Sequence, residues 1–151
     1  MYRRLGISYH LIPLEDCKVT SELRTQINDV MQLIGKLQQT PGSKILLHCR
    51  QGVSRSALIA CAYLIGAYKL DLIQALTYLN ERRKMAPCIE YIMVLSALEE
   101  EWLNKRSISF DAAIELMCGD IPTDMAAVFL SSYDFIFRII HPKLAFLKKV
   151  Y

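Results

Sequence analysis

The sequence lacks three features that would assign a protein to a class by themselves. It has no long apolar run, since the longest mainly apolar stretch without a charge, residues 56–68, is shorter than the ~18 residues that span a bilayer. It has no excess of charge: 18 basic and 15 acidic residues leave +3, which indicates neither a nucleic acid nor a membrane as partner. The short apolar run after Met1 also lacks the length of a cleaved export signal. We therefore expect a soluble protein.

The sequence also lacks a C-x-x-C pair. Five cysteines stand at irregular spacing, namely Cys17, Cys49, Cys61, Cys88 and Cys118. An odd number without close pairs fits reduced thiols better than a disulfide framework or a zinc cage. We therefore expect an intracellular, cytoplasmic protein, with the nucleus as an open alternative.

The 151 residues, 53% of them hydrophobic, suit one domain with an ample core and exclude intrinsic disorder. Residues 7–12 alternate apolar and polar, and residues 44–48 form a short apolar run, so both are predicted strands. A strand that is apolar on both faces is typical of a parallel sheet. Spacings of three and four and cap residues predict helices at residues 20–39, 56–67, 71–83, 87–102 and 109–118, with two more after residues 123 and 142. The pattern indicates an α/β fold.

The segment HCRQGVSRS, residues 48–56, joins a predicted buried strand to a predicted buried helix. A loop at this position directs backbone N–H groups and the positive end of the helix toward one point, which makes an anion site suited to phosphate. Gly52 permits the tight turn. Cys49 at the mouth of this loop would be stabilised as a thiolate nucleophile. The guanidinium of Arg55 can hold two phosphoryl oxygens at once, which a lysine cannot do.

This C-x5-R loop, with His48 before the cysteine, closely resembles that of the cysteine-dependent protein tyrosine phosphatases, dual-specificity branch. The resemblance covers roughly residues 7–103, including IPLED at residues 12–16 and the stretch 82–87. It implies a small, mostly parallel sheet flanked by helices. It also implies hydrolysis through a phosphocysteine intermediate without a metal or another cofactor.

Carried over by position, the resemblance gives each site residue a role. Cys49 is the nucleophile, Arg55 is the phosphate clamp, and Asp16 is the general acid and then base. Ser56 assists departure of the thiolate, and His48 helps to lower the pKa of the cysteine. The phosphate-binding residues are Arg50, Gln51, Gly52, Val53, Ser54 and Arg55, and no metal ligand is expected.

Several alternatives stay open at this stage. Glu15 rivals Asp16 as the acid. Cys17 or Cys88 could form a protective disulfide with an oxidised Cys49, although spare thiols are the commoner case. The basic run at residues 82–84 could attract acidic substrates, although a helix end facing water is the simpler account.

The arrangement of domains is also a prediction. We assign residues 1–106 to a catalytic domain and residues 107–151 to a helical extension packed on it. The family normally has further strands before the loop that carries Asp16, here residues 14–18 and called the acid loop, so either the sequence is truncated or another part covers the open sheet edge. The apolar C-terminal helices are the candidates for that cover.

The expected function is hydrolysis of phosphotyrosine in phosphoproteins, with phosphoserine and phosphothreonine as open additions. No nucleic-acid or membrane partner is expected, and the sequence does not indicate an oligomeric state. The alternative is a weak or inactive module that binds phosphate or phosphoproteins. A phosphoinositide phosphatase, an RNA 5′-phosphatase and a sulfurtransferase rank lower, because the loop has only Arg50 as an extra basic residue and has the size that phosphate needs.

Overall fold

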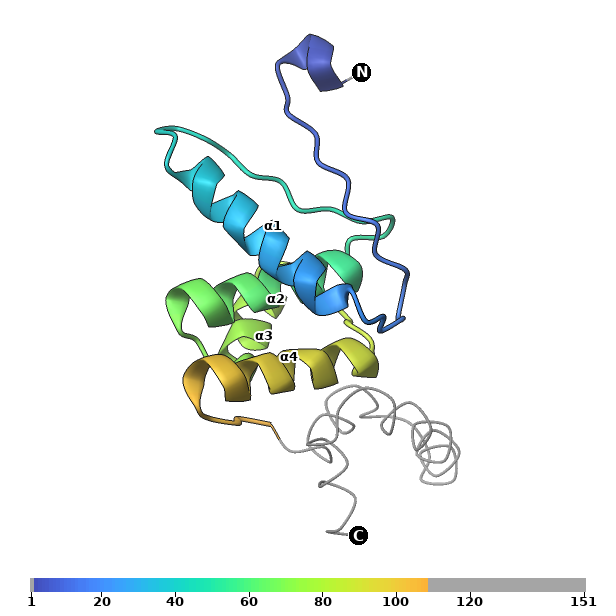
Figure 1. Ribbon diagram of the computed structural model, residues 1–151, viewed down its shortest axis with the longest axis vertical. Coiled ribbons are helices and arrows are strands. Elements are labelled where there is room, and N and C mark those ends of the chain that lie inside the picture. Colours follow the sequence, from blue (N-terminus) through green and yellow to red (C-terminus); the bar gives the residue numbers. More distant parts are fainter. Residues whose placement is uncertain (1, 109–151) are drawn as a thin grey trace, which may run out of the picture.

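The computed structural model describes residues 2–108, and the predicted helices after residue 108 lie outside them. The described chain begins with a short 3-10 helix, η1 (Tyr2–Leu5). Four α-helices follow: α1 (Leu23–Gln38), α2 (Arg55–Tyr68), α3 (Leu72–Asn80) and α4 (Ile89–Leu103). Figure 1 shows them packed together, with the N-terminal segment extending away from them. None of these helices is long and apolar enough to cross a membrane.

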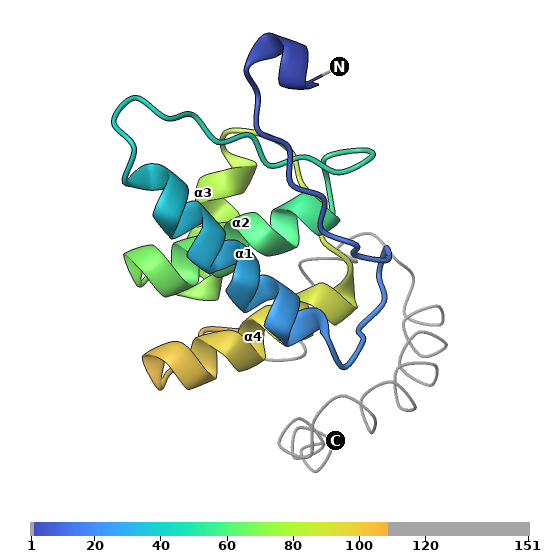
Figure 2. The same ribbon diagram turned by 45° about the horizontal axis from the view of Figure 1, so that its top comes forward.

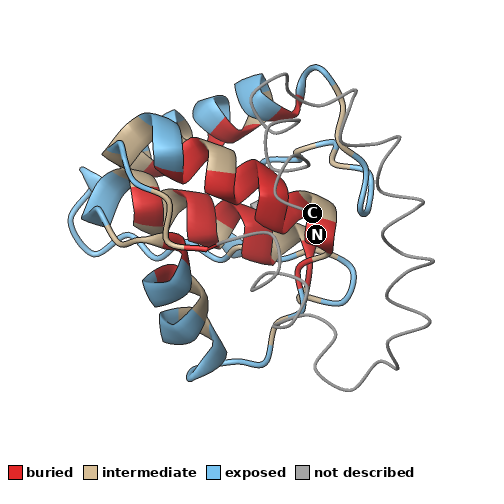
Figure 3. Ribbon diagram, turned by 90° about the horizontal axis from the view of Figure 1, so that it is seen from below, coloured by how far each residue is buried: buried red, intermediate tan, exposed pale blue. Residues whose placement is uncertain are grey.

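Helix α2 is the centre of the fold, as its nearly continuous apolar sequence predicts. It contacts α1, α3 and α4, and its side chains Leu58, Cys61 and Ile65 have no exposed surface. Helix α1 contributes one apolar face, including Ile27 and Val30, at the predicted spacing. Buried positions therefore gather where the helices face one another (Figure 3).

The helix boundaries follow local signals in the sequence. The helix predicted from residue 71 begins with a capping box, which the pair Asp71 and Gln74 indicates in the sequence: the Gln74 N–H donates to the Asp71 side chain, and the Asp71 N–H donates to the Gln74 side chain. Helix α4 begins two residues after Pro87, close to its predicted start. Helix α3 ends at Asn80, earlier than predicted, and its C-cap is Glu81.

A buried carboxylate joins α4 to the start of α3. Glu99 has no exposed surface. One oxygen accepts from the Leu72 N–H at 3.1 Å, and the other accepts from the Ser107 N–H at 3.0 Å. The first N–H groups of a helix lack partners within the helix, so Glu99 satisfies one of them inside the core.

The predicted sheet is not confirmed, because neither predicted strand is one in residues 2–108. Residues 7–12 and 44–48 are extended, and no backbone hydrogen bond joins the two segments. Most of their apolar side chains remain in water, with Leu11 75% exposed and Leu46 82% exposed, whereas Ile12 and Leu47 are half-buried against the helices. Both segments lie on the same side of the group of helices (Figures 1 and 2). An extended segment becomes a strand only when a neighbour pairs with its backbone, and the described residues supply no such neighbour.

Candidate active site

The loop at residues 48–56 wraps around the sulfur of Cys49 and runs into the N-terminus of α2. Gly52 has a φ of +75°, which a residue with a side chain rarely adopts. This conformation directs the Gly52 N–H to the Cys49 Sγ, at 3.1 Å. The Oγ of Ser56, in the first turn of α2, lies 3.5 Å from the same sulfur. The loop therefore presents donors to a negative charge on Cys49, as the sequence predicts.

The surroundings of Cys49 favour its thiolate. Burial alone would raise the pKa of Cys49, but hydrogen bonds from the Ser56 side chain and from the backbone of Ser56, Gly52 and Gln51 outweigh it and lower this pKa to about 6. The buried Cys61 gives the contrast within the same protein, because burial raises its pKa to about 12. Cys49 is therefore the thiol suited to nucleophilic attack near neutral pH.

Arg55 and Asp16 meet across the mouth of this loop. The Nη2 of Arg55 donates to the Asp16 Oδ2 at 3.4 Å, and the Arg55 Nε lies 3.4 Å from Oδ1. That Nε is buried and makes no hydrogen bond within residues 2–108. The Asp16 side chain is 52% exposed, whereas that of Arg55 is 25% exposed. The guanidinium thus keeps donor capacity for an anion, with a carboxylate beside it.

Tyr91 anchors the acid loop, and the sequence did not predict this role. The hydroxyl of Tyr91, in α4, donates to the Glu15 carbonyl oxygen at 2.6 Å. Tyr91 has no exposed surface, and burial raises the pKa of its hydroxyl above the usual range. In the sequence Tyr91 falls within the predicted helix at residues 87–102, and nothing there indicates a contact with residue 15.

The stretch before α4, residues 83–86, supports the loop at residues 48–56, called the phosphate loop. The Ala86 N–H donates to the Val53 carbonyl at 3.0 Å, and the Arg83 Nη2 donates to the Gln51 carbonyl at 3.3 Å. A Cβ on Gly52 would lie 2.6 Å from the Arg83 Nη2. Arg83 thus contacts this loop, which the sequence did not predict, while Arg82, Arg83 and Lys84 are all exposed, as the account of a helix end facing water requires.

The other candidate residues are less closely joined to Cys49. Ser54 is buried, and its Oγ lies 3.9 Å from the Cys17 sulfur. The Glu15 side chain pairs with Lys18 at 2.7 Å and is 64% exposed, so Asp16 is the acid that meets Arg55. His48 and Arg50 are exposed. No hydrogen bond of the His48 ring is found within residues 2–108.

A second cluster lies beside the acid loop. The sulfur atoms of Cys17 and Cys88 and a carboxylate oxygen of Glu90 all lie within 4.8 Å of one another. Burial, followed by the hydrogen bond with Cys17, raises the pKa of Cys88 above the usual range of a thiol. Spare thiols were the commoner case expected for both cysteines, and their long separation in sequence gives no sign of this contact.

The comparisons with known proteins agree with the geometry of the loop. Residues 2–101 match the family "Dual specificity phosphatase, catalytic domain". Human (Homo sapiens) dual specificity protein phosphatase 26 is 32% identical over 98 residues, which cover 65% of this chain and 46% of that protein. Dual specificity protein phosphatase 2 of Mus musculus is 31% identical over 96 residues, covering 63% of this chain and 30% of that protein.

Human dual specificity protein phosphatase 5 is 32% identical over 98 residues, which cover 64% of this chain and 25% of that protein. The chain thus spans less than half the length of these curated relatives. The family match covers more than half of the chain and includes the acid loop, the C-x5-R loop and all of α2 and α3. The chain therefore belongs to the family of dual specificity phosphatase catalytic domains.

Proposed function

We propose that the chain is a protein phosphatase that hydrolyses phosphomonoesters through a phosphocysteine intermediate on Cys49. The observation that carries the proposal is the environment of this thiol: a pKa of about 6, a donor at 3.1 Å and a hydroxyl at 3.5 Å. A thiolate at the positive end of a helix, next to an arginine with a buried free donor, is suited to attack on a phosphoryl group.

The first step transfers the phosphoryl group to sulfur. The Cys49 thiolate attacks phosphorus, the S–P bond forms, and the bond from phosphorus to the substrate oxygen breaks. Arg55 holds two of the three phosphoryl oxygens while backbone N–H groups of the loop bind the third, which positions the group and offsets the developing charge. Asp16 donates a proton to the departing oxygen, which leaves as the alcohol or phenol.

The second step releases phosphate. The Asp16 carboxylate takes a proton from a water molecule as that water attacks phosphorus, and the S–P bond breaks. The electron pair returns to the sulfur of Cys49, where Ser56 and the Gly52 N–H stabilise the thiolate. The substrate must replace the Asp16 carboxylate at Arg55, and a phosphate dianion can do so because it offers a bidentate partner with more charge.

The proposed substrates are phosphoproteins. Support comes from the relatives, which are named as dual specificity protein phosphatases. We infer that phosphotyrosine is accepted and that phosphoserine and phosphothreonine are also hydrolysed. Peptides that carry one phosphorylated residue of each kind in the same flanking sequence test this inference by their kcat/KM values.

We also infer that residues 7–12 and 44–48 hold the strand positions of a phosphatase sheet. Both segments are extended, and their backbones form no hydrogen bonds with each other, so both have groups that can pair with a neighbouring strand. Hydrogen exchange of the amides in residues 44–48 tests this point. Protection comparable to that of α2 supports a paired strand, and exchange at the rate of a free peptide contradicts it.

The experiment for the function compares the chain with its Cys49→Ser variant on a chromogenic aryl phosphate, in the presence of a chelator. We expect metal-independent release of the phenol by the parent chain and none above background by the variant. Vanadate binding by both proteins serves as the control for an intact loop. A folded parent chain that binds vanadate but is as inactive as the variant would contradict the proposal and indicate a phosphate-binding module.

A further inference from the structure

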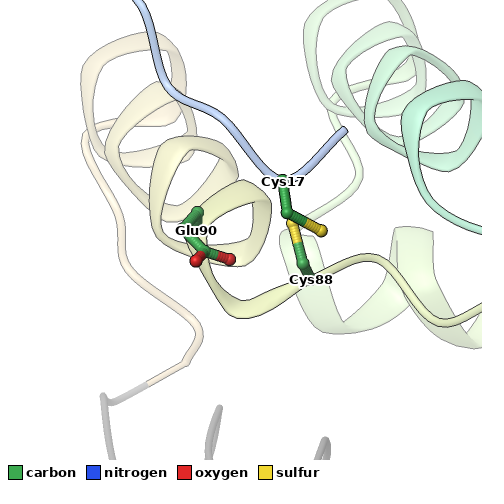
Figure 4. Close-up of side chains that lie close together, drawn as sticks. All are labelled: Cys17, Cys88 and Glu90. Atoms are coloured by element: carbon green, nitrogen blue, oxygen red, sulfur yellow. The ribbon is translucent and has the colours of Figure 1, made fainter. Parts of the chain in front are cut away.

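Two cysteines and one glutamate meet outside the catalytic loop. Cys17 follows the proposed acid in sequence, while Cys88 is the N-cap of α4 and Glu90 lies in its first turn. Their ligand atoms all lie within 4.8 Å of one another. Figure 4 shows the two sulfur atoms next to each other, with the Glu90 carboxylate on the same side of the helix start.

These donors fit a zinc ion. Zinc takes thiolate ligands at ~2.3 Å and carboxylate ligands at ~2.0–2.2 Å, so two ligands of a tetrahedral site lie roughly 3.5–3.8 Å apart. Rotation of the side chains can bring donors that now lie within 4.8 Å to that spacing. Magnesium and calcium prefer oxygen ligands, so the two thiols select against them.

The exposure of the cluster suits entry of the ion. Cys17 is exposed, whereas Cys88 and Glu90 are half-buried. The ion would thus be reached from the side of Cys17, and a water molecule could supply a fourth ligand there. The protein would supply three ligands from two segments that are distant in sequence.

We propose that Cys17, Cys88 and Glu90 form a zinc site that fastens the acid loop to the start of α4. Binding releases the two thiol protons to solvent. The zinc site would be a second attachment of this loop to α4, because the Tyr91 hydroxyl already donates to the Glu15 carbonyl oxygen. It also borders the phosphate loop, because the Cys17 sulfur lies 3.9 Å from the Ser54 Oγ.

A disulfide between Cys17 and Cys88 is the competing account of this pair. A variant of Glu90 distinguishes the two accounts, because the proposed zinc site uses the Glu90 carboxylate as a ligand and a disulfide does not. The Glu90→Gln variant keeps the size of the side chain but removes its charge. The Glu100→Gln variant, on the exposed side of the same helix, is the matched control.

The test measures zinc binding to the full chain in a Cys49→Ser background, so that the nucleophile cannot act as a ligand. A phosphine reductant keeps the remaining thiols reduced, and competition with a chromogenic chelator gives the affinity. We expect one zinc ion per chain. The Cys17→Ser variant should bind zinc at least ~100-fold more weakly. Removal of a residue that only hydrogen-bonds a zinc ligand already lowers zinc affinity by ~10–100-fold, and Cys17 is a ligand itself.

The other variants and a second readout complete the test. Glu90→Gln should weaken binding by at least ~10-fold, whereas Glu100→Gln should bind as the parent does. Zinc should raise the melting temperature of the parent but not that of Cys17→Ser. Cys17 is exposed, so its variant should fold. Equal zinc affinity in the parent, Cys17→Ser and Glu90→Gln would overturn the proposal, whether or not the chain is an active phosphatase.

Discussion

The Asp16 carboxylate and the Arg55 guanidinium form an ion pair across the candidate active site, with Oδ1 3.4 Å from Nε and Oδ2 3.4 Å from Nη2. The two residues come from segments that are distant in sequence, a loop before α1 and the first position of α2. Asp16 thus occupies the donors of Arg55 that the phosphoryl group of a substrate would take. Once the substrate replaces the carboxylate there, the Asp16 side chain lies beside the phosphoryl group, where a proton donor to the leaving oxygen is needed.

The first prediction concerns the identity of the general acid. Asp16→Asn should lower kcat for an aryl phosphate by ~10²–10⁴-fold, because the departing oxygen loses its proton donor. Glu15→Gln is the matched control and should change kcat by less than about threefold, since its carboxylate pairs with Lys18 and not with Arg55. Steady-state kinetics of both variants give the result. A larger loss in Glu15→Gln than in Asp16→Asn would assign the acid to Glu15.

The second prediction concerns the pH dependence of the nucleophile. The pKa of Cys49 is about 6, so the thiol is mainly protonated below pH 6 and mainly thiolate above it. The rate of Cys49 alkylation by iodoacetamide should therefore rise through pH 6 and level off above it. Ser56→Ala removes one donor to the sulfur and should move this midpoint to higher pH.

Mass spectrometry of the peptide that contains Cys49 gives the alkylation rate, and Cys61 serves as the internal control. Its pKa of about 12 and its burial predict slow alkylation throughout this range. A Cys49 rate that keeps rising to about pH 8.5, as for an ordinary thiol, would contradict the geometry of the loop.

The third prediction concerns the anchor of the acid loop. Tyr91→Phe removes the hydroxyl that donates to the Glu15 carbonyl, while the ring still fills the core. We expect kcat to fall by about tenfold with little change in KM, because a small displacement of a catalytic group is costly. Stability should fall by ~1 kcal/mol, the typical net value of one hydrogen bond. Tyr78→Phe, at an exposed position, is the control, and equal kcat values in the two variants would exclude a positioning role.

The fourth prediction concerns the buried carboxylate of Glu99. Glu99→Ala leaves two backbone N–H groups, those of Leu72 and Ser107, without their acceptor. The free energy of unfolding should fall by about 3 kcal/mol, since each unsatisfied buried group costs ~1–3 kcal/mol. Glu100→Ala removes an exposed partner of Arg106 and should cost less than about 1 kcal/mol. Urea unfolding of both variants tests the difference, and equal midpoints would contradict the role of Glu99.

The sequence predicts the parts of the fold that depend on local interactions. The spacing of Ile27 and Val30 predicts α1, and the Asp71 and Gln74 pair predicts the start of α3, because both signals lie within one or two turns of helix. The Cys49 and Arg55 loop could be predicted for the same reason, since all of its contacts with the sulfur come from residues 51–56.

The parts that the sequence did not predict depend on contacts between distant segments. The sequence gives no signal for the contacts of Tyr91 and Arg83, and only the folded chain brings their side chains to the carbonyl oxygens of Glu15 and Gln51. Strand formation at residues 7–12 and 44–48 depends on backbone pairing, which an alternating or apolar pattern does not specify. The long separation of Cys17 and Cys88 hid their contact in the same way.

The central claim is that the phosphoryl group of the substrate is transferred to the sulfur of Cys49 before water releases it as phosphate. The most direct measurement is mass spectrometry of the Ser56→Ala variant, denatured during turnover of an aryl phosphate under conditions that preserve the S–P bond. Loss of the Ser56 donor to the sulfur should slow breakdown of the intermediate. The account predicts one added phosphoryl group on the peptide that contains Cys49 and none in the Cys49→Ser protein. Turnover with no phosphorylated cysteine, or with the phosphoryl group on another residue, would contradict it.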